Sequence, residues 1–430
     1  MRERNAREGY GSDAADAVAA HRRYGGKIQI APKVPVRSLE DFDRWYTPGV
    51  ADACRAIERA PEEVWALTNR GNAVAVVTDG SRVLGLGDIG PAAALPVMEG
   101  KALIFKHVGD VDAVPLVLDT PDADTFVTVV QALAPSFGGI NLEDIAQPRC
   151  FGILAQLQER LEIPVWHDDQ QGTATVVLAA LHNALRIVGK TLAGVKIAMV
   201  GMGAANVANY RLLKAAGVDP AHVVAADVHG TLHPGREDLA AQAEVAPQWS
   251  ICLESNAEGA VGGVADAIRG ADVLIAFSAP GPDTIAPAWV ASMADDAIVI
   301  AGANPVPEIW PEAARAAGAR IVGTGRSDFP NQVNNALAFP GIFRGVLDVR
   351  ASVISEGMAI AAAEALARCA EWVGVGEDHI LPTLEELGVA AQVALATALA
   401  AQEEGRARAP GAEAEIRQRI AAHVRFSEEP

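Results

Sequence analysis

The feature of this sequence that most constrains its fold is an alternation of short apolar runs with longer Ala- and Leu-rich stretches of helical period. Such an alternation predicts an α/β fold, in which a largely parallel, doubly wound sheet is covered by helices. Ligands of such sheets bind at the carboxyl ends of the strands, so the small and polar residues after each run are the first candidates for a site. The runs occupy 73–79, 114–119, 138–145, 163–169, 196–203, 222–227, 271–278, 296–304 and 319–325.

The pattern divides the chain into two predicted domains. We expect residues 1–160 to form an N-terminal α/β domain, and residues 161–430 a Rossmann-type dinucleotide-binding domain with C-terminal helices. A chain of 430 residues, 50% of them hydrophobic, is long enough for each domain to bury its own core. The first twenty residues and the tail after Gly405 are charged and Ala-rich, so we expect both ends to be frayed.

Composition narrows the classes of partner. The formal net charge of −19 disfavours nucleic acid, because binding a polyanion requires a basic surface. No stretch approaches the roughly 20 apolar residues of a membrane span, and the N-terminal MRERNAREGYGSD lacks the apolar region of a signal peptide. We therefore expect a cytoplasmic protein with a small-molecule ligand and no membrane partner. The four cysteines are widely spaced, which predicts small buried side chains rather than disulfides or zinc ligands: Cys54, Cys150, Cys252 and Cys369.

A glycine-rich turn follows the predicted strand at 196–203 and precedes a predicted helix. It reads Gly201-Met-Gly203-Ala204-Ala205-Asn206, which departs from the pattern GxGxxG at its last position. Glycines there let the backbone turn tightly and approach a pyrophosphate, which then binds the N–H groups at the start of the helix. The sequence predicts a dinucleotide site, with a glycine turn that binds nothing as the simpler alternative.

The next predicted strand ends in an acidic residue, Asp227. A carboxylate at this position can hydrogen-bond the ribose hydroxyls and repel a 2′-phosphate, which favours NAD over NADP. His229 and the more distant Arg236 leave the phosphorylated cofactor open.

Two pairs of acidic residues follow predicted strands of the first part of the chain. Asp168 and Asp169 end the run IPVWHDD, and Glu143 and Asp144 follow GGINL. A helix cap would explain one member of the first pair, but adjacent like charges are unfavourable unless a cation lies near. Because parallel strands end at the same edge of a sheet, the four carboxylates are able to converge. Oxygen ligands without His or Cys select Mg²⁺ or Mn²⁺.

The segment at 77–106 contains five glycines, and Arg82 and Lys101 within it are two cations available for an anionic ligand. Lysine is scarce in this chain, and Lys101 precedes the apolar ALIF. An apolar site beside a metal ion would lower the pKa of the lysine and make it usable as a base, whereas an ordinary surface lysine is the alternative. Tyr46, which precedes a Thr-Pro-Gly turn, is on composition alone a half-buried packing residue.

Several segments together resemble the malic enzymes in their short bacterial form, which lacks a phosphotransacetylase-like domain. They follow one another in family order from about residue 20 to about residue 400. The resemblance implies oxidation of L-malate by NAD(P)⁺ and decarboxylation to pyruvate and CO₂, dependent on Mg²⁺ or Mn²⁺, in a dimer or larger homo-oligomer. The segments are YTPGVA, VTDGSRVLGLGDIGPAAALPVMEGKALIFK, INLEDIAQPRCFGI, IPVWHDDQQGTA, VGMGAAN, AGANPVPEIW and GRSDFPNQVNNALAFPGIFRG.

The resemblance also divides the acidic residues by role. Glu143, Asp144 and Asp169 would hold the metal ion. Lys101 would take the proton of the malate hydroxyl as hydride leaves, and Asp168 would hydrogen-bond Lys101 rather than bind metal.

Further roles follow from the same resemblance. Tyr46 would protonate C3 of enolpyruvate, which replaces its packing role with that of a general acid. Arg82 is similar to the arginine that binds a malate carboxylate in animal-type enzymes.

Four polar residues complete the implied site. Asn304, Asn334 and Asn335 match amides that hold the substrate carboxylate. Thr173 and Asn304 are expected to contact the cofactor.

Two other classes of protein stay open at this point. Another two-domain dehydrogenase, of the amino-acid or methylene-tetrahydrofolate type, would share the layout without needing the acidic cluster. A dinucleotide-sensing regulator would bind the cofactor without turning over malate. The sequence also leaves open how far the enzyme decarboxylates oxaloacetate.

Overall fold

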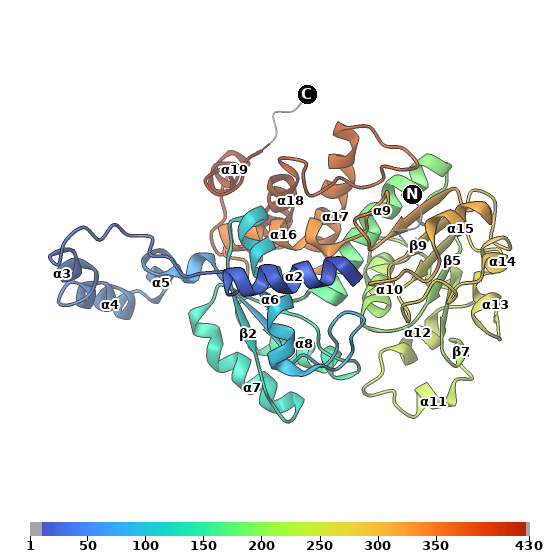
Figure 1. Ribbon diagram of the computed structural model, residues 1–430, viewed down its shortest axis with the longest axis horizontal. Coiled ribbons are helices and arrows are strands. Elements are labelled where there is room, and N and C mark those ends of the chain that lie inside the picture. The colour runs from blue at the N-terminus through green and yellow to red at the C-terminus, as the bar shows by residue number, and fades with distance from the viewer. Residues whose placement is uncertain (1–10, 427–430) are drawn as a thin grey trace.

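The computed structural model describes residues 11–426, which form two sheets flanked by helices (Figure 1). The four-stranded sheet is parallel throughout and has the order β2-β1-β3-β4. The six-stranded sheet has the order β10-β9-β8-β5-β6-β7 and is parallel except for β7. The predicted α/β fold with a Rossmann-type second domain is therefore confirmed. The strands are β1 Ala73–Thr78, β2 Asp112–Val117, β3 Gly139–Leu142, β4 Val165–His167, β5 Ile197–Val200, β6 Val223–Asp227, β7 Gly230–Thr231, β8 Val273–Ala276, β9 Ile298–Ala301 and β10 Ile321–Thr324.

Each predicted apolar run coincides with one strand of these sheets, although β2 begins two residues before its run. Strands such as β1 and β8 are buried along their whole length because helices cover both faces of the sheet, which is why they read as continuous apolar runs. The two-residue strand β7 was not predicted, since it is too short to carry a pattern. The domain boundary near residue 160 stays a prediction; β4, which follows it, belongs to the first sheet.

The order of the second sheet sets the position of a crevice. Strand β5 has β6 on one side and β8 on the other, so the chain leaves β5 in opposite directions across the two halves of the sheet. Ligands of doubly wound sheets bind in the crevice at such a switch point. The helices that cover the sheets up to this point are α6 Gly90–Gly109, α7 Ala123–Leu133, α8 Arg149–Arg160, α9 Thr173–Val188, α10 Ala204–Ala215, α11 Glu237–Ala240, α12 Gln248–Glu254, α13 Val264–Ile268, α14 Pro287–Val290 and α15 Pro311–Ala316.

The C-terminal helices return to the first domain and pack on α6 and α9 (Figure 1). A Cβ atom at Gly345 would lie 2.3 Å from the carbonyl oxygen of Ala394, so only glycine allows this close approach of two helices. The prediction of a frayed tail after Gly405 is wrong, because Ile416 and Ile420 of the last helix are buried. These helices are α16 Phe339–Asp348, α17 Glu356–Cys369, α18 Val389–Glu403 and α19 Glu413–Ala421.

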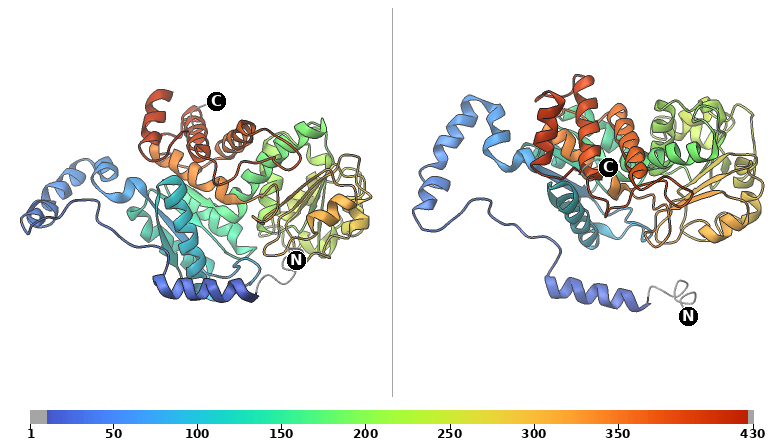
Figure 2. Two further views of the ribbon diagram at one scale, coloured as in Figure 1. Left: turned by 45° about the horizontal axis from the view of Figure 1, so that its top comes forward. Right: turned by 90° about the horizontal axis from the view of Figure 1, so that it is seen from above.

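A segment near the N-terminus extends away from both sheets (Figures 1 and 2), although Lys27 at its start donates to Glu99 and to the carbonyl oxygen of Pro96 in the first domain. Residues 11–20, predicted to be frayed, belong to helix α2 (Gly11–Tyr24), whereas residues 1–10 lie outside the described part of the chain. Residues 27–67, here called the arm, carry α3 (Asp41–Trp45), α4 (Val50–Arg59) and α5 (Val64–Leu67). None of these three helices has a buried residue.

Two further sequence predictions concern the cysteines and the membrane. All four cysteines are free, as predicted, and three are buried, whereas Cys54 is exposed on the arm. Among residues 11–426, no helix combines the length and the apolar character that crossing a bilayer requires.

Candidate active site

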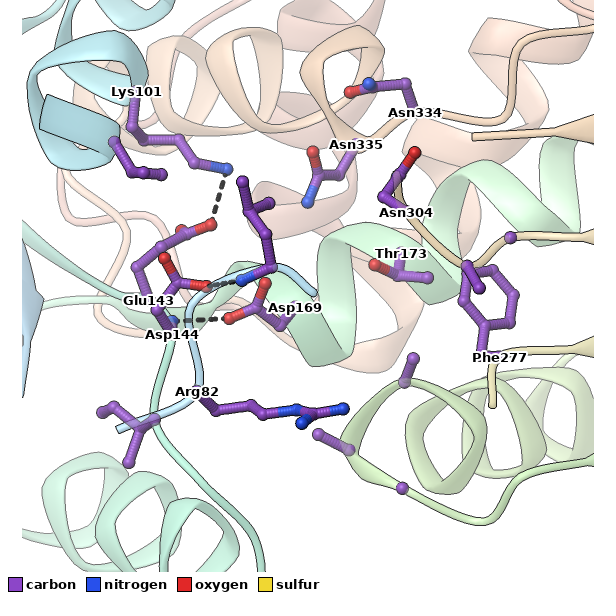
Figure 3. Close-up of a pocket in the computed structure, with 18 of the residues that line it drawn as sticks. Arg82, Lys101, Glu143, Asp144, Asp169, Thr173, Phe277, Asn304, Asn334 and Asn335 are labelled. Atoms are coloured by element: carbon purple, nitrogen blue, oxygen red, sulfur yellow. Dashed lines mark hydrogen bonds and ion pairs between the residues drawn. The ribbon is translucent and has the colours of Figure 1, made fainter. Parts of the chain in front are cut away.

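A cavity of about 1040 Å³ is lined by residues that follow the strands of both sheets (Figure 3). The carboxyl ends of β1, β3 and β4 contribute from one side, and those of β5, β8 and β9 from the other. It therefore lies at the switch point of the second sheet. The predicted site residues that line it are Arg82, Lys101, Glu143, Asp144, Asp169, Thr173, Gly203, Ala204, Ala205, Asn304, Asn334 and Asn335.

Lys101 is the central cation of this cavity and is 8% exposed on helix α6. Its Nζ lies 2.5 Å from Oδ2 of Asp168 and 2.9 Å from Oε1 of Glu143, and 4.3 Å from the ring centre of Phe339. The second oxygen of Asp168 accepts a hydrogen bond from Nε1 of Trp166 at 3.0 Å. Asp168 is thus fully engaged and oriented toward Lys101 from behind the cavity, which it does not line.

The backbone around Asp168 is shaped for this contact. Residues Asp168–Gly172 form a π-helical turn between β4 and α9. A Cβ atom at Gly172 would lie 1.9 Å from Oδ1 of Asp168, so any larger residue would displace the carboxylate. Single π-helical turns often mark functional positions, because they re-aim side chains at the start of a helix.

Three more carboxylates face the cavity near Lys101. The backbone N–H of Asp144 donates to Oδ2 of Asp169 at 2.7 Å, and Nδ2 of Asn141 donates to Oε2 of Glu143 at 2.9 Å. Asp144 has a left-handed backbone (φ 54°), which is strained for a non-glycine residue and typical of functional sites. Its Oδ2 is buried and has no hydrogen-bond partner among the described residues.

Burial and mutual repulsion perturb the protonation of this cluster. Burial, together with the neighbouring Asp169, raises the pKa of Asp144 to about 8. Burial also raises the pKa of Glu143 and of Asp169. For Lys101, burial lowers the pKa but the charges of Asp168 and Glu143 more than offset it, so the pKa is raised. The lowered lysine pKa expected beside a metal ion stays a prediction, because these directions describe the protein residues alone.

These residues fit a hard divalent cation by their chemistry. In the described part of the chain, no three His, Cys, Asp or Glu side chains are already arranged to hold a metal ion. Oε1 of Glu143 and Oδ2 of Asp169 are instead engaged by Lys101 and by the backbone of Asp144. Glu143 and Asp144 are nevertheless buried, half-buried Asp169 raises the pKa of both, and one oxygen of Asp144 has no partner among the described residues. Mg²⁺ or Mn²⁺ would stabilise such a cluster.

The glycine turn after β5 forms the opposite wall. Gly201 has φ +83°, and a Cβ atom there would lie 2.6 Å from the carbonyl oxygen of Phe277. Gly203 directly precedes α10, and it lines the cavity together with Ala204 and Ala205 of the first turn. Asn206, which replaces the third glycine, is buried and donates from Nδ2 to the carbonyl oxygens of Val200 (2.9 Å) and Gly201 (3.0 Å). Asn206 therefore stabilises the turn. Neither Gly201 nor Asn206 lines the cavity.

Asp227 ends β6 outside the cavity and is bound by Arg236. The guanidinium of Arg236 is 7% exposed and contacts both oxygens of Asp227, at 3.0 and 2.8 Å. Asp238 holds its other edge through two hydrogen bonds of 2.7 Å. Arg236 is therefore not available to an additional anion in this arrangement.

Tyr46 lies outside the cavity of its own chain. It is 69% exposed on the arm, and no tyrosine of residues 11–426 lines the cavity. The sequence placed it with Lys101 because the motifs resemble one family, but the arm carries it away from the sheets (Figure 1).

Several lining residues were not predicted from the sequence. Phe277 and Ser278 directly follow β8, so the strand-end rule applied to that run would have found them. Lys27 and Gln147 carry no such signal, because they reach the cavity from a loop and from the turn before α8.

Comparison with known proteins agrees with this geometry. Residues 25–158 match the family model described as the malic enzyme N-terminal domain, and residues 170–402 match the malic enzyme NAD-binding domain. The NAD-dependent malic enzyme of Geobacillus stearothermophilus is 49% identical over 385 residues, which cover 89% of this chain and 78% of that protein. The bifunctional malic/malolactic enzyme of Bacillus subtilis is 48% identical, with 91% and 94% covered.

Solved structures give the same result. The crystal structure of a malic enzyme from Entamoeba histolytica superposes with a TM-score of 0.92 at 44% identity, over 95% of this chain and 85% of that one. A malic enzyme from Pyrococcus horikoshii has a TM-score of 0.88 at 49% identity, over 93% and 92% of the two chains.

Proposed function

The chain belongs to the malic enzyme family, and from this premise we propose that it oxidises L-malate with NAD⁺ and decarboxylates the product to pyruvate and CO₂. The observation that carries the proposal is a buried lysine, paired with Asp168 and Glu143, that shares one cavity with the glycine turn at the start of α10. A base beside a dinucleotide site is what oxidation of a secondary alcohol requires.

Lys101 is the proposed base. It accepts the proton of the malate hydroxyl, and Asp168 holds its amine in position through the 2.5 Å contact. Glu143, Asp144 and Asp169 would hold Mg²⁺ or Mn²⁺, and engaging Glu143 in this way would remove one of the two carboxylates that raise the pKa of Lys101. When bound, the cation would supply Lewis-acid charge beside the reacting oxygen, and NAD⁺ would accept the hydride.

Polar residues along the cavity suit the carboxylates of malate. The guanidinium of Arg82 extends along the cavity floor, and Asn335 points into it beside Lys101 (Figure 3). Arg82 forms no ion pair with a carboxylate among the described residues, which leaves its charge for a ligand. Asn304 lies between Asn335 and Phe277 (Figure 3). Asn334 accepts a hydrogen bond from the backbone N–H of Ala336 and so stabilises the turn before α16.

We assign the general acid to Tyr46 of a second copy of the chain. The arm exposes large apolar side chains around Tyr46, among them Leu39 (84%), which is unfavourable in water unless another surface covers them. Leu84, which lines the cavity, and the nearby Leu86 are exposed in the same way. A homodimer in which each arm covers the partner's cavity mouth would bury both surfaces and bring a tyrosine to each Lys101.

The ribose end of the site favours NAD⁺. Asp227 keeps a carboxylate at the end of β6, and Arg236 is held between Asp227 and Asp238. Asp227→Ser would remove the repulsive charge and release one edge of Arg236. We expect the ratio of kcat/KM for NAD⁺ over NADP⁺ to fall at least tenfold, while Glu237→Gln, a neighbouring exposed change, leaves the ratio unchanged.

Initial rates with L-malate test the proposed function. We expect NADH and pyruvate to form in equal amounts in the presence of Mn²⁺, with slower turnover on NADP⁺, and chelation of divalent cations to stop the reaction. Decarboxylation of added oxaloacetate should require the same cation. Lactate as the sole product, or malate oxidation that survives complete chelation, would contradict the proposal.

A further inference from the structure

A second cavity, of about 380 Å³, lies at the opposite end of helix α16 from the catalytic cavity. The first residue of α16, Phe339, contacts Lys101, whereas its last residue, Asp348, lines the second cavity. The other walls come from α5 and the turn after it, from the end of α19, and from Lys33 on the arm. This cavity takes no part in the reaction proposed above.

Basic side chains dominate the lining of this cavity. Arg344 forms its floor and is 2% exposed. It donates to Oδ1 of Asp348 and to Oδ1 of Asn72, both at 2.5 Å, but its Nε has no hydrogen-bond partner among the described residues. A buried guanidinium N–H without a partner is unfavourable, so this atom points to a missing acceptor.

Two further arginines line the cavity without an ion pair. Arg350 contacts the ring of Trp65 at 5.8 Å, and Arg419 donates only to the backbone oxygens of Asp348 and Ala409, both at 2.9 Å. Within residues 11–426, neither arginine has a carboxylate oxygen in ion-pair distance. In a chain with a net charge of −19, two arginines that line one cavity without an ion pair are a marked local exception.

The remaining charged groups around the cavity are already matched. Lys33 pairs with Asp112, and His423 with Asp110, both at 2.9 Å. Asp348 is the one carboxylate among the lining residues described, and it is held by Arg344. The surplus positive charge therefore rests on Arg350 and Arg419, with the free Nε of Arg344 beneath them.

We propose that this cavity binds a compact dianion, either a phosphate group or a small dicarboxylate, between Arg350 and Arg419 and above Arg344. Arginine forks match the paired oxygens of both groups, and the indole of Trp65 provides an apolar wall. The volume lies within the range of small-ligand sites.

Isothermal titration with inorganic phosphate and, separately, with succinate tests the proposal on the full-length protein. We expect at least one probe to bind the native protein with a Kd in the millimolar range or below, and the double variant Arg350→Gln/Arg419→Gln to weaken it at least tenfold. If only one probe binds the double variant more weakly than the native protein, that probe is the kind of dianion that the second cavity binds. Succinate that binds in the catalytic cavity would bind the double variant and the native protein equally. Arg417→Gln, on the same helix as Arg419 but paired with Glu413, is the matched control and should bind like the native protein.

Equal affinities of the native protein and the double variant would overturn the proposal, as would the absence of binding by both probes at 20 mM. Thermal melting without added anion checks that the double variant is folded. If that variant is unstable, the single variant Arg350→Glu replaces it, and it should abolish binding of the same probe.

Discussion

The two regions that carry the proposed acid and base differ in burial and in the contacts that hold the two side chains. Lys101 is buried, pairs with Asp168 and Glu143, and lies between two sheets. Tyr46 is largely exposed on an arm whose helices contain no fully buried residue. The base is therefore held by the fold of one chain, whereas the acid has no surroundings that hold it in place within that chain.

This difference is the physical argument for the proposed homodimer. Burying a large apolar side chain stabilises a protein by about 1.5–3 kcal/mol, and the arm leaves several such side chains in water. A compact single domain would fold such an arm back onto itself. An arm that instead carries Tyr46 away from its own cavity is better suited to complete the catalytic cavity of a second copy of the chain.

The largest effect is expected at the buried region. Lys101→Ala should lower kcat with L-malate by about 10²–10⁴-fold, because a positioned base contributes that much to proton transfer. Binding of NADH and Mn²⁺, measured by fluorescence titration, should persist. Lys106→Ala, on the exposed side of the same helix, is the control and should keep full activity. A Lys101→Ala enzyme near full speed would show that the base is another group.

Substitution of Tyr46 on the arm should give the next largest loss of activity, and the lost group should act on the cavity of the partner chain. Tyr46→Phe should lower kcat by roughly 10²-fold, since it removes the proton donor but keeps the ring. Mixing inactive Tyr46→Phe and Lys101→Ala chains, after dissociation and reassembly, should restore about a quarter of the native activity, because half of the dimers then contain one intact site. If both residues acted within one chain, the mixture would stay inactive.

The sequence predicted the fold and the buried half of the site more fully than the exposed half. Strand-end rules located Glu143, Asp144 and Asp169 because parallel strands end at one edge of a sheet. Nothing in the spacing of Tyr46 and Lys101 predicted that Tyr46 lies on an arm, far from Lys101 of the same chain. A sequence motif gives the identity of its residues but not the position of the segment in space. The raised pKa of Lys101 could not be predicted from the sequence either, because it depends on the 2.5 Å contact with Asp168.

Within the buried region, the two adjacent aspartates should separate by function. Asp169→Asn removes a proposed ligand and should weaken Mn²⁺ affinity by about 10–100-fold, measured by titration of activity and of protein fluorescence. Asp168→Asn should lower kcat but change Mn²⁺ affinity less than threefold, since Asp168 contacts Lys101 and Trp166 instead of the cavity. Equal losses of Mn²⁺ affinity in both variants would contradict this division.

The smallest expected effect is a pH dependence of stability to which the buried Asp144 contributes. Burial raises the pKa of Asp144 to about 8, whereas in the unfolded chain it is near 3.8. Between these values the folded protein retains a proton that the unfolded chain has lost, so its stability decreases as the pH rises from about 4 to 8, by at most about 1.4 kcal/mol per pH unit. With divalent cations chelated, urea unfolding at pH 5.5 and pH 8 should show this loss, and Asp144→Asn should reduce it. Asp52→Asn on the arm, where the carboxylate is exposed, should leave the loss unchanged. A loss of equal size in Asp144→Asn and the native protein would mean that the buried cluster does not hold this proton.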